Sequence, residues 1–190
     1  LGFLNNKQLF FKIILSSIPV IFFGFLLIRY NLIDYLRNYK VIGWSTIIFG
    51  FLLYFSDRME IKNSINHDFK YSKALYIGLF QILSLIPGVS RSGITISAAR
   101  FFNFSRIDSA KISFLLSIPT LGAVSLFNIQ KLIIEKSFSV SLLNLLGVFL
   151  SFFFSYITIK FLIKFLQKFS LTSFVVYRII LGMIILIYAY

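Results

Sequence analysis

The sequence predicts an all-α, polytopic integral membrane protein with about five transmembrane helices and one re-entrant helix–loop–helix hairpin. Of its 190 residues, 58% are hydrophobic and 13% are charged, whereas soluble domains average about 45–50% apolar and about 25% charged residues. No stretch alternates between polar and apolar residues with period two, which argues against an outer-membrane barrel. The absence of Cys excludes a disulfide framework and a thiolate site.

The net charge of +13 would suggest a nucleic-acid partner in a soluble protein. In a membrane protein it is more typical of basic loops that face the cytoplasm and anionic lipid. Because the hydrophobicity favours the membrane, we expect contact with membrane lipid and no nucleic acid.

Apolar stretches between the charges predict spans near residues 11–29, 41–56, 112–130, 138–159 and 172–190. A span needs about 20 apolar residues, with about 17 as the lower end, and flanking Lys and Arg side chains extend the shorter stretches to the interface. The connections are too short to hold a soluble domain, so residues 1–190 are expected to form a single integral membrane domain.

Residues 74–102 are predicted to form the re-entrant hairpin. The apolar stretch 74–86 would give a helix of roughly 20 Å, which is shorter than the roughly 30 Å hydrocarbon core. Pro87, Gly88 and Gly93 then favour a break, and Arg100 interrupts the second apolar stretch. Irregular backbone at membrane depth must be buried in protein or line a polar cavity, so the tip is expected to be a polar site.

The predicted tip carries the chemistry of an anion site. Ser92 is a suitable N-cap for a helix that starts at Gly93, which would leave the N–H groups of Gly93, Ile94 and Thr95 free. Arg91 adds a fork of donors that matches phosphate oxygens. The alternative is that Arg91 pairs with helix-end carbonyls or extends to lipid headgroups.

Two residues outside the tip are further candidates. Gln81 precedes Pro87 by one and a half turns, so it could form a hydrogen bond into the cavity or could instead join two helices. Arg178, inside the last span, could support the site from a neighbouring helix or anchor the chain at the interface.

The motif Pro-Gly-x-Ser-Arg-Ser-Gly-x-Thr, within residues 77–96, closely resembles the second signature of the undecaprenyl-diphosphate phosphatase family of the bacitracin-resistance type. Residues 113–119 and 174–178 are similar to later parts of that family, so the resemblance covers essentially the whole chain. It implies hydrolysis of undecaprenyl diphosphate to undecaprenyl phosphate and inorganic phosphate in the bacterial cytoplasmic membrane. That reaction recycles the lipid carrier of cell-wall precursors and confers bacitracin resistance.

The resemblance implies roles for the serines, the threonine and the arginine of the tip, and a divalent cation (Mg²⁺ or Ca²⁺). A homodimer is a further expectation. The site residues are expected to be Arg91, Ser90, Ser92 and Thr95 for catalysis, with Gly88, Gly93, Gln81 and Arg178 in substrate binding.

One family feature has no match in this sequence. Family members carry an earlier hairpin signature with two glutamates, whereas Glu60 and Glu135 here fall in polar loops, as does His67. The chain is therefore expected to be the C-terminal portion of an inverted-repeat fold. The nucleophile or base and the cation ligands would precede Leu1, which would impair this chain alone. The alternative function is a non-enzymatic membrane transporter or carrier of phosphorylated lipid.

Overall fold

The computed structural model of the protein describes residues 7–32, 36–134 and 142–190. Five of its helices are long and apolar enough to cross a membrane: α2 (Lys7–Arg29), α4 (Tyr39–Asp57), α8 (Arg106–Ile134), α9 (Leu142–Lys168) and α10 (Thr172–Ala189). The remaining helical elements are α5 (Ile65–Asp68), α6 (Tyr71–Ile82), the 3₁₀ turn η1 (Leu83–Leu85) and α7 (Arg91–Phe101). The prediction of an all-α polytopic membrane protein is confirmed.

Several helices run past the charges that bound the predicted spans. α8 begins at Arg106 rather than near 112, and α9 continues through Lys160 and Lys164 to Lys168 rather than ending near 159. Lys and Arg are good helix formers, so a charge can mark the edge of the hydrocarbon without ending the helix. Residues 138–141, at the start of the predicted fourth span, lie outside the described residues.

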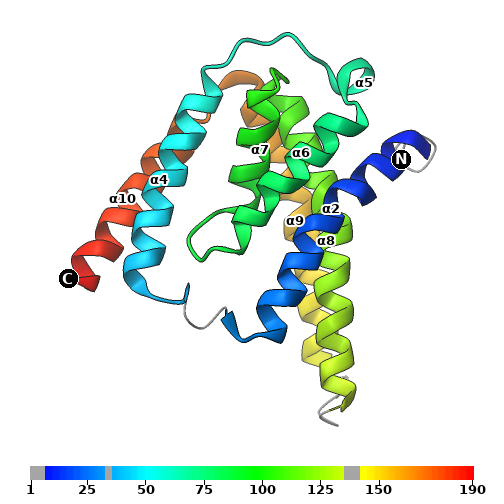
Figure 1. Cartoon of the computed structure of the whole chain (residues 1–190), viewed down its shortest axis with the longest axis vertical. Helices are drawn as coiled ribbons and strands as arrows, with labels where there is room; N and C mark the ends of the chain where they lie inside the picture. Colours follow the sequence, from blue (N-terminus) through cyan, green and yellow to red (C-terminus); the bar gives the residue numbers. More distant parts are fainter. Residues whose placement is uncertain (1–6, 33–35, 135–141) are drawn as a thin grey trace.

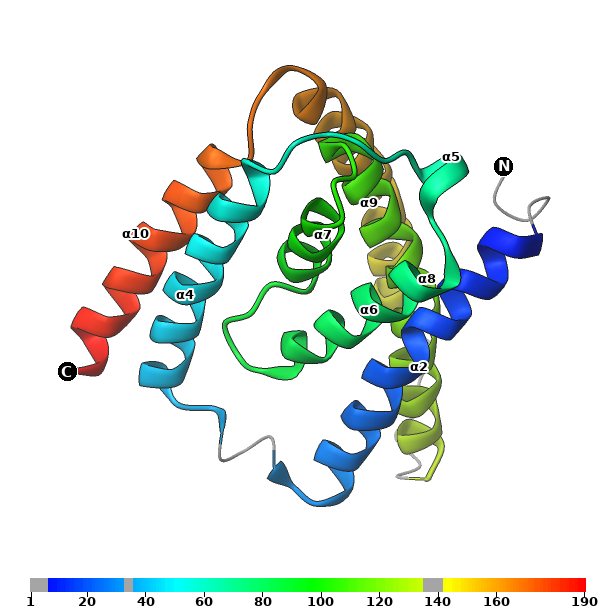
Figure 2. The ribbon, with the colours of Figure 1, turned by 45° about the horizontal axis from the view of Figure 1, so that its top comes forward.

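The helices α6 and α7 form a hairpin inside the molecule. In Figures 1 and 2 it lies between the α4–α10 pair on one side and α2 with α8 on the other. Both of its ends lie on the same side of the molecule, because the Asn103 carbonyl, just after α7, accepts hydrogen bonds from the Lys62 and Asn63 N–H groups, which precede α6 (both 3.0 Å). The chain therefore enters and leaves the hairpin on one face.

Small residues let the helices around the hairpin approach closely. A Cβ on Gly78 of α6 would overlap the backbone of Ser16 in α2, so these two helices cross at backbone contact. On the other side, a Cβ on Gly182 of α10 would lie 3.0 Å from the carbonyl oxygen of Gly43 in α4. Close approach at small residues is the usual way in which membrane helices associate.

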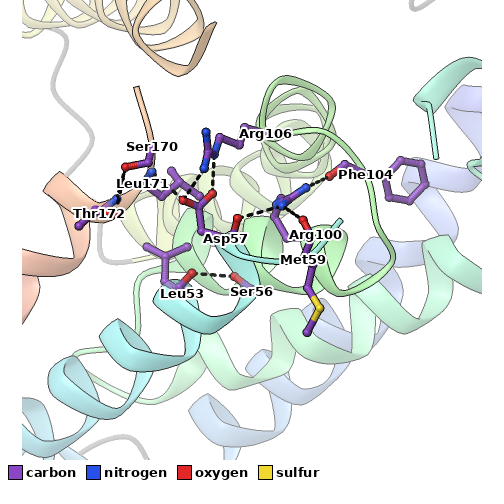
Figure 3. Close-up of polar contacts among 10 residues, drawn as sticks. All are labelled: Leu53, Ser56, Asp57, Met59, Arg100, Phe104, Arg106, Ser170, Leu171 and Thr172. Atoms are coloured by element: carbon purple, nitrogen blue, oxygen red, sulfur yellow. Dashed lines mark hydrogen bonds and ion pairs between the residues drawn. The ribbon is translucent and has the colours of Figure 1, made fainter. Parts of the chain in front are cut away.

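Asp57, at the end of α4, joins three helices on the face where the hairpin begins and ends (Figure 3). Its carboxylate accepts two hydrogen bonds from Arg106, from Nε at 2.6 Å and Nη2 at 3.0 Å, and one from the Leu171 N–H at 3.1 Å. Because Arg106 starts α8 and Leu171 caps α10, one carboxylate fixes the ends of α4, α8 and α10.

Arg100 extends this network to the hairpin. Its side chain is 2% exposed and donates hydrogen bonds to backbone carbonyl oxygens around it, those of Asp57 (3.0 Å), Met59 and Phe104. A buried charged group in a membrane protein needs such partners. The charge that interrupts the second apolar stretch of the sequence is therefore a structural tie between α7 and α4.

Candidate functional site

The hairpin tip breaks where the sequence predicts it. α6 ends at Ile82, and the 3₁₀ turn η1 that follows it ends at Leu85. Gly88 then has a φ of 90°, a backbone conformation that residues with a Cβ rarely adopt. A Cβ at this position would also lie 2.5 Å from the carbonyl oxygen of Ile42 in α4. The tip therefore requires glycine both for its turn and for its contact with α4.

Two spanning helices hold this tip in place. From α4, Ser45 Oγ donates to the Pro87 carbonyl (2.6 Å) and Thr46 Oγ1 to the Gly88 carbonyl (3.3 Å). From α10, Arg178 Nη2 donates to the same Gly88 carbonyl at 2.9 Å, and the arginine is 8% exposed. Arg178 was expected either to support the site from a neighbouring helix or to anchor the chain at the interface. The structure shows that it contacts the tip.

The N-cap of α7 is Ser90, not Ser92, so that prediction is wrong. α7 begins at Arg91, and Ser90 Oγ accepts from the Gly93 N–H at 3.2 Å, while the Ile94 N–H donates to the Ser90 carbonyl at 2.9 Å. Ser and Thr cap helices through this bond to the third helical N–H, and both serines have the required spacing to a later N–H. Local spacing alone does not distinguish them. Glycine at 93 fits the observed start of the helix, because a Cβ there would lie 3.0 Å from Arg178 Nη1.

The shift of the cap changes which donors the helix end offers. The N–H groups predicted to be free at Gly93 and Ile94 are paired, and Thr95 lies far enough into the helix for the regular pairing four residues back. Within the described chain, no acceptor takes the N–H groups of Arg91 and Ser92. These two backbone donors, rather than the three predicted ones, are available at the positive end of α7.

Arg91 is half-buried and keeps most of its donor capacity. Its Nη1 donates to Thr120 Oγ1 of α8 at 3.1 Å, and no other acceptor for its guanidinium occurs in residues 7–32, 36–134 and 142–190. A guanidinium carries several N–H donors in a planar fork. Arg91 is thus neither paired with helix-end carbonyls nor ion-paired, and it is held by one hydroxyl.

Arg91 borders a cavity of about 670 Å³ between α7, α8 and α9. We call it the hydroxyl cavity, because its polar lining consists of Arg91 and the hydroxyl-bearing residues Ser92, Ser113, Ser117, Ser151, Ser155 and Thr158. Among the residues that the structure describes, no carboxylate lines this cavity. A cavity with one positive charge and several hydroxyl donors is suited to an oxyanion.

A second cavity, of about 470 Å³, lies between the tip, α4, α10 and the end of α9. Near the tip it is lined by Ser90, Ser92, Gly93 and Arg178, and elsewhere mainly by aliphatic side chains such as Leu53. We call it the apolar cavity. Ser92 lines both cavities, so the start of α7 separates a polar compartment from an apolar one.

Two predicted site residues line neither cavity. Thr95 is 1% exposed, and its hydroxyl bonds to Ser113 Oγ at 2.7 Å, which fixes α7 on α8. Gln81 is fully buried, and neither atom of its side-chain amide has a hydrogen-bond partner in the described part of the chain. Neither of the two bonds expected for Gln81, into the cavity or between helices, is therefore present.

In the described ranges, no carboxylate lines either cavity at the tip. Asp57 is paired with Arg106, Glu60 pairs with Lys62 at 2.7 Å, and His67 is exposed in α5. Glu135 lies outside the described residues. No three acidic or histidine side chains gather in the described ranges, so these residues do not fit a divalent cation, which stays a prediction from the resemblance.

The hydroxyls of α8 and α9 are site residues that the sequence analysis missed. Ser151, Ser155 and Thr158 follow the spacing i, i+4, i+7 inside an uncharged apolar stretch, which places them on one helix face. That spacing was the available signal. Arg91 is distant from these residues in the sequence, so only the fold shows that their helix face borders the same cavity as Arg91.

Known proteins are similar to this chain over nearly its whole length. The sequence model of the family described as bacitracin resistance protein BacA matches residues 4–184. The undecaprenyl-diphosphatase of Pelagibacter ubique (strain HTCC1062) is 46% identical over 187 residues, which cover 98% of this chain and 73% of the relative. The undecaprenyl-diphosphatase of Jannaschia sp. (strain CCS1) is 38% identical over 97% of this chain and 69% of the relative. That of Roseobacter denitrificans (strain ATCC 33942 / OCh 114) is also 38% identical, over 94% of this chain and 67% of the relative. The chain belongs to the bacitracin resistance protein BacA family.

Proposed function

We propose that this protein is a membrane phosphatase that hydrolyses undecaprenyl diphosphate to undecaprenyl phosphate and inorganic phosphate. Family membership and relatives named undecaprenyl-diphosphatase support this activity. The observation in the fold that carries it is the position of Arg91, a largely uncommitted guanidinium beside a hydroxyl-lined cavity, next to an apolar cavity. An amphiphile with a diphosphate head and a prenyl chain matches both compartments.

The residues of the tip supply positioning and charge. Phosphoryl transfer depends mostly on in-line positioning and on stabilising the equatorial oxygens. The Arg91 fork and the uncapped N–H groups of Arg91 and Ser92 donate to those oxygens, and Ser90 and Ser92 orient the head group beside them. Arg178, whose buried Nε has no partner in the described part of the chain, keeps the tip and Gly88 in place. Thr95 acts through its bond to α8.

The substrate also suggests the location of the protein. We place the protein in the bacterial cytoplasmic membrane, where hydrolysis recycles the carrier of cell-wall precursors and lowers sensitivity to bacitracin. A homodimer and a divalent cation belong to the same proposal. In support of a dimer, α9 is exposed along most of its length.

The test is phosphate release from undecaprenyl diphosphate, in detergent, by the protein purified from its complete reading frame. Arg91→Ala should lower turnover by about 10²–10³-fold, as loss of one donor to a developing oxyanion does, and Arg91→Lys should restore only part of it because an ammonium lacks the planar fork. Arg29→Ala, an exposed arginine at the end of α2, is the matched control. Near-normal turnover of Arg91→Ala would refute the assigned role. Lipid binding without any phosphate release by the unmodified protein would indicate the carrier instead.

A further inference from the structure

α9 presents three hydroxyls to the hydroxyl cavity. Ser151, Ser155 and Thr158 line it together with Arg91, which lies on α7. On the rest of α9 the neighbours are large and apolar, such as Phe152 and Ile157, and they are exposed on the outside of the molecule. The three hydroxyls therefore form a polar strip on the side of α9 that lines the cavity, beside the apolar lining residues Leu150, Phe154 and Ile159.

The hydroxyls of this strip are free to bind a ligand. Many other helix hydroxyls donate to a carbonyl of the preceding turn, as Ser117 does to Phe114 (2.6 Å) and Thr120 to Leu116 (2.9 Å). The buried hydroxyls of Ser97 and Ser109 are exceptions in the described part of the chain. For Ser151, Ser155 and Thr158 the described part of the chain provides no partner. Polar groups without partners are unfavourable at membrane depth, so a polar ligand in the cavity would stabilise this arrangement.

The chemistry of the lining selects the ligand class. In the described residues the lining has one guanidinium, six hydroxyl-bearing residues and no carboxylate, which complements a compact oxyanion with several acceptor oxygens. Ser92 lines both cavities, so a lipid diphosphate whose head group lies beside Ser92 would have its chain on the side of the apolar cavity and its terminal phosphate on the side of the hydroxyl cavity.

We propose that the Ser151–Ser155–Thr158 strip of α9 is the binding wall for the terminal phosphate of the substrate and for the inorganic phosphate that hydrolysis releases; this inference rests on the proposed function. In the reaction, an oxygen of water bonds to the terminal phosphorus, and the bond from that phosphorus to the bridging oxygen breaks. The lipid monophosphate retains the bridging oxygen, and the two protons of water end on the two products. The lipid product stays with its chain, whereas inorganic phosphate is left against α9.

The test compares the unmodified protein with Ser151→Ala/Ser155→Ala/Thr158→Val in the same detergent. Dissociation constants for inorganic phosphate and for pyrophosphate are measured by ³¹P NMR, and turnover is measured with the lipid diphosphate. Three lost hydrogen bonds should weaken phosphate binding on the order of tenfold or more and raise KM more than they lower kcat. Tyr156→Phe, which removes a hydroxyl of the same helix that does not line the cavity, should change neither value. Ser155→Ala alone should weaken binding a few-fold and is the gentler variant if the triple one fails to fold.

The outcomes separate this inference from the proposed function. Unchanged phosphate and pyrophosphate affinity in the folded triple variant, or in Ser155→Ala, would overturn the binding wall even if the unmodified protein hydrolyses its substrate. Weakened affinity in the variants, with no hydrolysis by the unmodified protein, would support the phosphate site while the proposed function fails.

Discussion

Replacing Gly88 by alanine tests whether the tip conformation depends on this glycine. Alanine would have to adopt a φ of 90°, and left-handed backbone costs a residue with a Cβ about 1–2 kcal/mol. The new Cβ would also lie 2.5 Å from the Ile42 carbonyl oxygen and 3.0 Å from Ile42 Cα. Those are backbone atoms of a spanning helix, so they cannot rotate away, and overpacking of this kind costs about 1–3 kcal/mol.

The two contributions predict a loss of about 2–5 kcal/mol in the free energy of unfolding for Gly88→Ala. The loss should be accompanied by lower turnover, because moving the tip displaces Arg91. Unfolding is followed by circular dichroism during a titration with sodium dodecyl sulfate in mixed micelles. Gly122→Ala is the matched control, since a Cβ on this α8 glycine meets no heavy atom within 4 Å. If Gly88→Ala unfolds within about 0.5 kcal/mol of the unmodified protein, the assignment of the turn and its contact with α4 is wrong.

Three other substitutions test the packing around the hairpin. Gly78→Ala should cost about 1–3 kcal/mol in the same titration, because its Cβ would overlap the backbone of Ser16 and force α2 away from α6. Asp57→Asn should cost about 2 kcal/mol, near the lower end for buried pairs because the Arg106 side chain is 35% exposed, and unfolding at two salt concentrations measures it. Thr95→Val should cost about 1 kcal/mol through its lost bond to α8, with turnover reduced less than in the arginine variant.

Composition and backbone chemistry made the architecture predictable from sequence. Charges bounded the five apolar helices, and Pro87 with Gly88 marked the break, because a missing donor and a positive φ are local properties of the chain. The helix ends were less accurate, as α9 shows by continuing to Lys168. The charge pattern marks the edge of the hydrocarbon. It does not show where a helix ends, because Lys and Arg are compatible with a continuing helix.

The errors at the site come from interactions between distant residues. Ser90 and Ser92 are equivalent as caps by local rules, so the sequence does not distinguish them, whereas the structure shows Ser90 in this position. Arg178, which lies 85 positions beyond Gly93, packs against the same turn. Gln81 was expected to reach a partner, but its neighbours on other helices offer none in the described residues. Local spacing gives the kinds of groups at the tip, whereas the fold decides which of them stay free.

Three arginines near the hairpin differ in what remains available to a ligand. Arg100 donates to three backbone carbonyls at the base, and Arg178 donates to the carbonyl of Gly88 at the tip. Arg91 donates only to the hydroxyl of Thr120 in the described part of the chain. Two arginines thus hold the base and the tip by binding the backbone, which fixes the start of α7. Arg91 can keep its guanidinium N–H groups for an anion, because Arg100 and Arg178 fix the helix start on which it lies. Donors that are preorganised in this way stabilise developing charge without reorganising.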